Sequence, residues 1–250
     1  MQRSVKLKLN LLITLWLYTT AVNGQVTPSG LAGRLENKLW EAIGGKENWQ
    51  NARYFMFSCS GGRHSFAQGD RRYLWDKQTG NCRFDGITTD DEAVTALFNL
   101  KTNAGTVYIN DVKLENPRTT NDIVTEVTEE FNRDAQLLFL PTILDGSRGS
   151  YKITGEKLIG SQRLTVISVE NKHTSFDTTV SGQLYVDSQT GRIRQWWPDN
   201  EAVGLFVDDY KAIGSGLILP TRFRNSDTVT VTYPIAAALV HIEGQKFSLP

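Results

Sequence analysis

Hydrophobic and polar residues alternate through much of the second half of the chain. In residues 228–233 (TVTVTY), valines and a tyrosine share one face and threonines the other, and residues 183–186 and 239–243 repeat the pattern. A period of two is typical of antiparallel strands with one buried and one solvated face. The pattern predicts about seven strands, at 151–159, 162–170, 181–187, 192–197, 203–210, 217–224 and 227–242, the last of which has room for two.

Four short runs rich in aromatic residues come before this region, at 53–58, 64–67, 71–75 and 81–84. Glycine-containing turn sequences separate them. Such tight loops join the antiparallel strands of hairpins, whereas parallel strands need long crossover connections. These runs therefore predict an antiparallel meander.

Three segments have the apolar spacing of amphipathic helices. At 29–43, leucines and an isoleucine recur every four residues, and a Gly-Gly pair follows as an end signal. At 89–100, acidic residues in the first turn precede an apolar face. At 121–133, Ile, Val and Phe form a third stripe, and a short strand at 106–109 lies between the last two helices.

These elements predict an α+β fold that is mostly β. A large curved antiparallel sheet would wrap over a few helices packed on one of its faces. No internal repeat, low-complexity tract or Pro/Ser-rich linker divides the sequence. We therefore expect a single domain over residues 25–250.

Residues 1–24 have the pattern of a secretory signal peptide. Two lysines precede an apolar run at 9–18 that is interrupted by one Asn and one Thr, and small residues follow, with cleavage expected after Gly24 or Ala21. An uncleaved anchor would need roughly 20 apolar residues to span a bilayer. No later run approaches that length, and no cysteine follows the segment to carry a lipid. We expect a periplasmic or secreted protein without a transmembrane segment after cleavage.

Removal of this segment changes the charge balance. It holds Arg3, Lys6 and Lys8 and no acidic residue, so Lys and Arg fall from 27 to 24 against 27 Asp and Glu. The remaining chain has a net charge of about −3, without blocks of one sign. Nucleic acid is therefore not an expected partner, because its binding needs a clustered basic surface.

The chain has two cysteines, Cys59 and Cys82, which fall on neighbouring predicted strands. In an oxidising compartment two such cysteines usually pair, so the sequence predicts a structural disulfide. Two free thiols are the alternative. A catalytic thiol is the third choice, because no helix start or partner base lies beside either residue to lower its pKa.

Searches for catalytic motifs give no match. The sequence has no nucleophile elbow, zinc-protease motif, phosphate-binding loop, Cys-x-x-Cys pair or dinucleotide fingerprint. The three histidines, His64, His173 and His241, are far apart in the sequence, and the acidic cluster at 90–92 is explained by helix capping. We expect no catalytic residues, no metal and no cofactor, and so no enzyme.

Several segments together resemble one known family. They are 72–80 (RYLWDKQTG), 132–145 with its Asn-x-Asp and Leu-Pro-x-x-Leu-Asp passages, 184–191 (LYVDSQTG) and 209–221 (DYKAIGSGLILPT). In this order they are similar to exported bacterial proteins placed with the LolA/LolB lipoprotein-carrier superfamily, and the resemblance covers nearly all of residues 30–243. It implies an unclosed β-barrel over helices, with an apolar cavity that holds acyl chains in the carriers. Without a lipid-anchoring cysteine, this chain does not resemble the anchored receptor.

Three hypotheses follow for the function. The first is an exported, non-enzymatic binder or carrier of a lipid, a lipoprotein acyl chain or another hydrophobic ligand. The second is an envelope protein-interaction module with a filled core and an aromatic edge at Trp196 and Trp197. The third is an exported hydrolase, which would need titratable residues that converge in one cleft. From their positions in the sequence, the expected ligand-lining residues are Leu138, Phe139, Leu140, Trp196 and Phe206.

Overall fold

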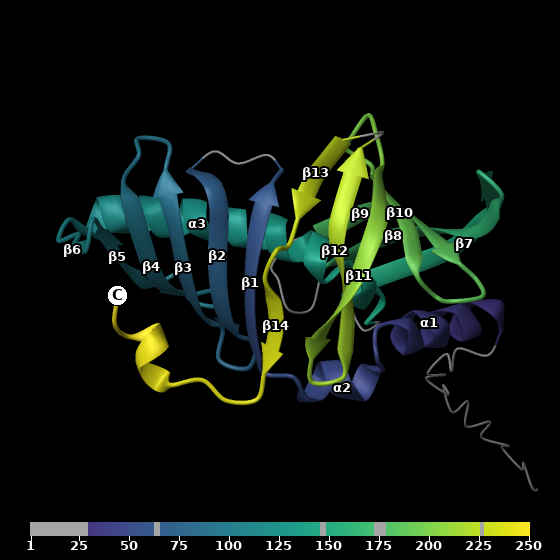
Figure 1. Cartoon of the computed structure of the whole chain (residues 1–250), viewed down its shortest axis with the longest axis horizontal. Coiled ribbons are helices and arrows are strands. Elements are labelled where there is room, and N and C mark those ends of the chain that lie inside the picture. The colour runs from purple at the N-terminus through teal and green to yellow at the C-terminus, as the bar shows by residue number, and fades with distance from the viewer. Residues whose placement is uncertain (1–29, 63–65, 146–148, 173–178, 226–227) are drawn as a thin grey trace, which may run out of the picture.

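A long, curved antiparallel sheet dominates the molecule, and helix α3 (Pro117–Leu138) runs along one face of its first strands (Figure 1). The computed structural model describes residues 30–62, 66–145, 149–172, 179–225 and 228–250. The predicted signal peptide, 1–24, lies outside the described residues, as do His64 and His173.

Strands follow one another in the sheet almost in chain order. The order is β6-β5-β4-β3-β2-β1-β13-β12-β11-β10-β9-β8-β7, and β14 pairs with another part of β1. Every recorded pair is antiparallel. The strands are β1 (Tyr54–Gly61), β2 (Ala67–Asp76), β3 (Asn81–Thr88), β4 (Ala93–Asn99), β5 (Gly105–Ile109), β6 (Val112–Lys113), β7 (Gly149–Ile159), β8 (Gln162–Lys172), β9 (Thr179–Asp187), β10 (Ile193–Pro198), β11 (Leu205–Gly214), β12 (Leu217–Asn225), β13 (Thr228–Thr232) and β14 (Ala236–Leu239).

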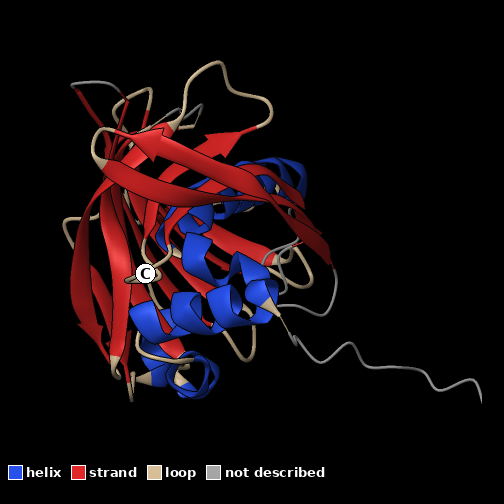
Figure 2. Cartoon of the chain, turned by 90° about the vertical axis from the view of Figure 1, so that its right-hand side faces the viewer, coloured by secondary structure: helices blue, strands red, loops and turns tan. Residues whose placement is uncertain are grey.

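The sheet curves around the helices without closing on itself (Figure 2). Its two ends, β6 and β7, do not pair with each other in the described part of the chain. The predicted class, an α+β fold that is mostly β with an open curved sheet, is therefore confirmed. The seven strands predicted from residue 151 onward are also confirmed, and the last of them divides into β13 and β14.

Two of the three predicted helices are present. Helix α1 (Leu31–Ala42) covers most of the predicted 29–43, and α3 extends the predicted 121–133 at both ends. The side chain of Asn116 accepts hydrogen bonds from the backbone N–H of Arg118 and Thr119, which caps the start of α3. The remaining helical segments are short: α2 (Lys46–Asn51) and the 3-10 turns η1 (Leu140–Leu144) and η2 (Gly244–Phe247).

The helix predicted at 89–100 is wrong, because this segment forms a turn and strand β4. The acidic residues belong to the turn, in which the Thr88 hydroxyl accepts hydrogen bonds from the backbone N–H of Asp90 and Glu92. In β4 the buried Val94, Ala96 and Phe98 alternate along the strand. This period of two fits a strand, and pairing with both β3 and β5 stabilises it.

A dense group of aromatic rings fills the space between α3 and strands β1–β3. Phe139, which is fully buried just after α3, lies at its centre. Its ring centroid is 5.1 Å from that of Phe55, 5.4 Å from that of Trp49 and 5.7 Å from that of Trp75. Rings at these separations attract one another in addition to burying apolar area. This part of the interior is therefore packed.

The predicted disulfide between Cys59 and Cys82 is wrong, and both thiols are free and buried. Cys59 lies on β1 opposite Arg71 of β2, whereas Cys82 lies on β3 opposite Trp75 of β2. A whole strand therefore separates the cysteines, and they are four residues apart along it. Strand spacings of about 4.8 Å and rises of about 3.3 Å per residue put them far beyond the reach of a disulfide. The prediction took the two cysteines to be on neighbouring strands, whereas β2 lies between β1 and β3.

No helix in the described part of the chain is long and apolar enough to cross a membrane.

Replacing the central ring tests this packing. We expect Phe139→Ala to lower the free energy of unfolding by about 3–5 kcal/mol, because it removes a fully buried ring and leaves a cavity. Urea denaturation followed by circular dichroism measures the change. The control is Phe206→Ala, since Phe206 is only half-buried. A loss below about 1 kcal/mol for Phe139→Ala would contradict the packed interior.

Thiol titration tests the free cysteines. We expect no reaction with a disulfide-exchange reagent in the native protein, because both thiols are buried and burial raises the pKa of each. After unfolding in guanidinium without reductant, both thiols should react. If neither reacts until a reductant is added, the cysteines are bonded after all.

Candidate functional site

The two halves of the sheet meet at a narrow joint in β1. The first part of β1, Tyr54 to Phe57, pairs with β14, whereas Ser60 and Gly61 pair with Thr232 and Val231 of β13. We call this second contact the seam. At Gly61, φ is 78° and an added Cβ would lie 2.2 Å from a backbone oxygen of β13, so the close approach requires glycine.

A buried ion pair lies beside the seam. Arg71 of β2 is fully buried, and its guanidinium donates hydrogen bonds to both carboxylate oxygens of Asp134, at 2.6 and 3.0 Å. It also donates to the carbonyl oxygen of Gly61, at 2.8 Å, and its Nε lies 3.3 Å from a carboxylate oxygen of Glu130. Because Glu130 and Asp134 belong to α3, this arginine ties the helix to the seam.

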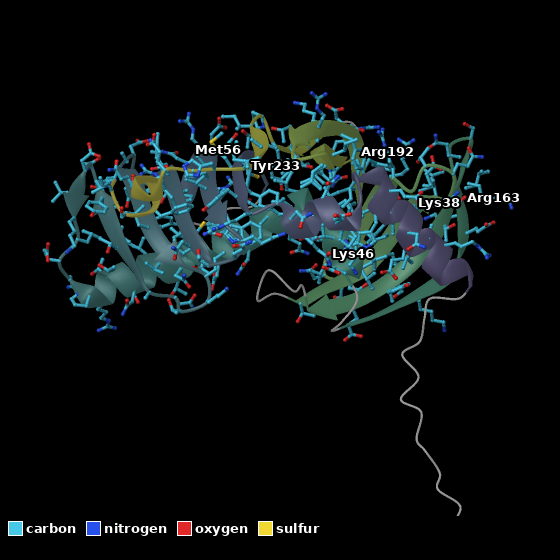
Figure 3. All side chains as sticks on the ribbon, turned by 90° about the horizontal axis from the view of Figure 1, so that it is seen from below. Lys38, Lys46, Met56, Arg163, Arg192 and Tyr233 are labelled. Carbon is cyan, nitrogen blue, oxygen red and sulfur yellow. The ribbon has the colours of Figure 1, made fainter. Side chains whose placement is uncertain are left out.

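Two tyrosines and a thiol complete this buried network. The Tyr73 hydroxyl donates to the Asp134 carboxylate, and the Tyr233 hydroxyl donates to the Asp134 backbone carbonyl. Tyr233 lies between the two halves of the sheet (Figure 3). Burial and the neighbouring Asp134 raise the pKa of Tyr73, and burial also raises the pKa values of Tyr233 and Cys59. All three groups therefore stay protonated at neutral pH: the tyrosine hydroxyls donate to Asp134, and the Cys59 sulfur accepts a hydrogen bond from Arg71.

An open groove of about 920 Å³ lies next to the network, and we call it the seam groove. The last turns of α3 form one side, and β9, β10 and the loop before β11 form the other. The ends of β1, β12 and β13 lie along it as well. The apolar part of its lining consists of Leu137, Trp196, Pro198, Val203, Leu205 and Val231.

Local sequence explains how Trp196 reaches the floor of this groove. It is fully buried on β10, opposite Leu205 of β11. On the neighbouring β9, Gly182 has φ of 152°, and an added Cβ would lie 2.6 Å from the Trp196 ring. Glycine at this position therefore leaves the room that the indole occupies.

Polar groups surround the apolar floor. Arg133 of α3 is partly exposed and lies 3.7 Å from Glu130, while Gln136, Asn200 and Glu201 also line the groove. An apolar floor with a few polar groups at its edge is typical of a site that binds a molecule with a polar end. The described residues contain no group of three or more His, Cys, Asp or Glu that could hold a metal ion.

The predicted ligand-lining residues fall in three places. Leu138, Phe139 and Leu140 are fully buried in the core at the end of α3, and none of them lines the seam groove. Trp196 lines its floor. Phe206 pairs with Gln195, next to the Trp196–Leu205 pair, so its side chain points to the opposite face of the sheet from Trp196. Contact between these residues and a ligand stays a prediction.

The buried network was not among the predicted features, although the sequence contains a signal for it. Glu130 and Asp134 are spaced by four residues and fall in phase with the buried Val127 and Phe131. Acidic side chains on the apolar face of a helix must find a buried partner. The partner, Arg71, comes from a strand more than 50 residues away, and only the fold brings it there.

Comparison with known proteins identifies similar folds at low sequence identity. Neither a protein-family model nor a curated protein sequence matches the chain. A DUF1329 family protein from Desulfovibrio piger is similar in structure, with 10% identity, a TM-score of 0.40, and coverage of 85% of this chain and 95% of that one. A LolA superfamily protein from Nitrosomonas europaea has 10% identity and a TM-score of 0.37, with coverage of 82% of this chain and 97% of that one. The lipoprotein LppX from Mycobacterium tuberculosis has 9% identity and a TM-score of 0.32, with coverage of 86% of this chain and 100% of that one. At these TM-scores the likeness is one of general arrangement alone.

Removing the cation of the buried network tests its role. We expect Arg71→Met to lower the free energy of unfolding by about 3–5 kcal/mol, because two carboxylates would stay buried without their cation. Adding Glu130→Gln and Asp134→Asn to the same chain should restore part of this loss, since the acids then become neutral. Urea denaturation measures both. If the triple variant were as unstable as the sum of its single changes, the ion pair would not be the cause.

Proposed function

We propose that this protein is an exported, non-enzymatic binder of an apolar or amphipathic molecule, which it holds in the seam groove. The observation that supports this is an open volume of about 920 Å³ with an apolar floor of Leu137, Trp196, Leu205 and Val231. Small-molecule sites commonly have volumes of about 300–1,000 Å³ and mostly apolar linings. The resemblance of several sequence segments to lipoprotein carriers agrees with a lipid or acyl chain as the ligand.

Burial of the ligand's apolar surface would drive binding, at roughly 25 cal/mol for each Å² removed from water. The polar end of the ligand would remain at the edge, where Arg133, Gln136 and Asn200 offer hydrogen-bond donors. The buried Arg71–Asp134 pair lies behind this edge and fixes the last turns of α3, so one wall of the groove is preorganised.

Export is part of the proposal. The basic, apolar and small-residue succession of residues 1–24 supports a cleaved signal peptide, and hence work in the periplasm or outside the cell. A binder of apolar molecules has a clear use there, because acyl chains cannot cross an aqueous compartment unshielded.

An envelope protein-interaction module is the second candidate. The packed aromatic interior around Phe139 favours it, because rings occupy the space between strands β1–β3 and α3 where a long acyl chain would otherwise lie. In this case the seam groove would accept an apolar side chain of a partner protein, with the exposed Val203 at its edge.

The first test compares two substitutions in adjacent residues. We expect Leu205→Glu to weaken binding of the neutral apolar dye N-phenyl-1-naphthylamine by at least about tenfold, or about 1.4 kcal/mol, because it places a charge on the groove floor. Phe206→Glu is the matched control, since its side chain lies on the opposite face. Dye fluorescence measures both, and thermal unfolding checks that both variants fold.

Two results would argue against this assignment. Equal loss of dye binding in the two variants would remove the seam groove as the site, and loss in Phe206→Glu alone would move the site to the other face.

Native mass spectrometry of protein taken from its own envelope identifies the ligand. A defined lipid in the extract supports the carrier. A bare mass without dye or lipid uptake would favour the interaction module.

A further inference from the structure

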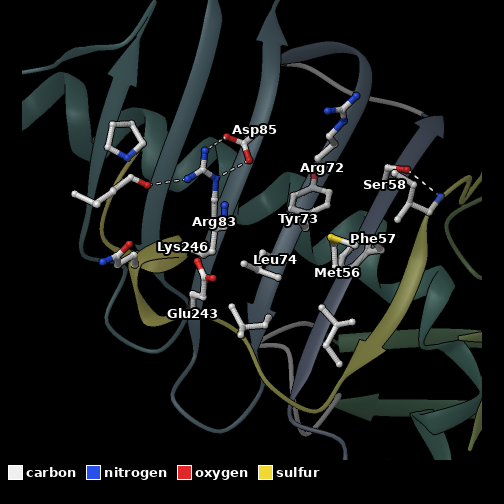
Figure 4. Close-up of a pocket in the computed structure, with 16 residues that line it drawn as sticks. Met56, Phe57, Ser58, Arg72, Tyr73, Leu74, Arg83, Asp85, Glu243 and Lys246 are labelled. Carbon is white, nitrogen blue, oxygen red and sulfur yellow. Dashed lines mark hydrogen bonds and ion pairs between the residues drawn. The ribbon is translucent and has the colours of Figure 1, made fainter. Parts of the chain in front are cut away.

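A second hollow lies on the outer face of the sheet, the face that points away from α3 (Figure 4). Strands β1–β3 form its floor, and the chain after β14 passes over it. Its volume is about 640 Å³. We call it the outer groove. Its lining includes Met56, Arg72, Leu74, Arg83, Glu243 and Lys246.

The C-terminal segment crosses these strands with few attachments. Arg83 donates a hydrogen bond of 2.7 Å to the carbonyl oxygen of Leu249, and the ring of Phe247 lies 6.3 Å from that of Tyr54. The turn η2 (Gly244–Phe247) also lies close to β3. The segment therefore lines one side of the outer groove, and strands β1–β3 line the other.

Apolar side chains are unusually exposed here. The described residues include eight exposed large hydrophobic side chains, and three of them, Met56, Ile235 and Leu249, line this one groove. Leu74 lies beside Met56 on the same face of the sheet. Met56 is 39% exposed and points away from α3 (Figure 3). Exposed apolar surface that gathers at one hollow commonly marks a binding site.

Positive charge lies at the edge of this apolar floor. Arg72 extends from β2 at one end, and Lys246 lies on the C-terminal segment with Glu243 near it (Figure 4). Arg83 is already occupied, because it donates to both carboxylate oxygens of Asp85. Within the described residues no carboxylate lies within ion-pair distance of Arg72. Asp85 lies opposite Arg72 on the neighbouring strand, but its carboxylate accepts hydrogen bonds from Arg83, so the Arg72 guanidinium remains available to an anion.

We propose that the outer groove is a second binding site, which takes an amphipathic anion. The carboxylate or phosphate of the ligand would lie against Arg72. Its acyl chain would lie on Met56 and Leu74, beneath the C-terminal segment. A volume of about 640 Å³ is in the range of small-molecule sites and leaves room for one chain. This site is separate from the seam groove, which lies on the other face of the sheet.

The experiment uses monomeric laurate as the anion and dodecanol as its uncharged analogue, with the mature chain. We expect Leu74→Glu to weaken laurate by at least about tenfold, because it puts a negative charge on the floor. Arg72→Gln should weaken laurate by about threefold to fivefold, the size of an exposed ion pair, and leave dodecanol unchanged. Val112→Glu, at an exposed apolar position outside both grooves, is the matched control. Isothermal titration calorimetry measures the affinities.

Methionine oxidation locates the bound ligand. Met56 is the only methionine after residue 24. We expect saturating laurate to slow the oxidation of Met56 by hydrogen peroxide, followed by mass spectrometry, because the chain covers the thioether. Leu205→Glu, which alters the seam groove, should leave this protection intact. The two proposals can therefore fail independently.

Four results decide the outcome. Laurate binding that is lost in Leu205→Glu and kept in Leu74→Glu would overturn the proposal, as would oxidation of Met56 at an unchanged rate. Binding to phosphatidylglycerol vesicles but not to laurate, lost in both Arg72→Gln and Leu74→Glu, would support the site and assign the anion to a membrane lipid. Binding of neither probe would overturn it.

Discussion

Arg71 is a charged side chain in a place that water does not reach, and the neighbouring structure is arranged to satisfy it. Its guanidinium bonds to Asp134 of α3 and to the carbonyl oxygen of Gly61 at the end of β1. A buried guanidinium without such acceptors would cost several kcal/mol. The position of α3 against the sheet, and the close approach of β1 to β13, are therefore linked through one residue. Helix propensity and strand pairing alone would not fix that relation.

The buried network around Arg71 lies between a packed part of the interior and an open one. On one side of the network, aromatic rings around Phe139 fill the space between α3 and strands β1–β3. On the other side, where α3 ends and β9–β11 curve away, the seam groove remains open. A helix of 22 residues spans about 33 Å and cannot follow a sheet that curves. The groove lies where the straight helix and the curved sheet separate.

Much of the fold could be predicted from the sequence, because period-two patterns persist when a strand has one wet face. The strands after residue 151 are of this kind. Helices α1 and α3 have the corresponding helical signal, an apolar stripe with a period of 3.6 residues. The helix predicted at 89–100 is wrong because acidic residues in a turn resemble the start of a helix. The alternation of Val94, Ala96 and Phe98 correctly indicates a strand. The predicted disulfide is wrong because β2 lies between the strands that carry the two cysteines, and the local sequence does not show the order of the strands in the sheet. Of the candidate site, only Trp196 was identified among the groove-lining residues, since the groove forms where distant segments meet and no local pattern marks it.

Strand β1 contributes side chains to both faces of the sheet. Phe55, Phe57 and Cys59 point into the packed interior, whereas Met56 points outward into the outer groove. Successive side chains of a strand point to opposite faces of the sheet, so the packing of the interior does not require an apolar residue at position 56. An outward Met among inward aromatics leaves apolar surface in water, a cost that burial beneath a ligand's acyl chain would offset. The same strand ends at Gly61, and the next residue, Gly62, lines the seam groove. Both grooves therefore depend on the register of β1, and a change that shifts this strand would alter them together.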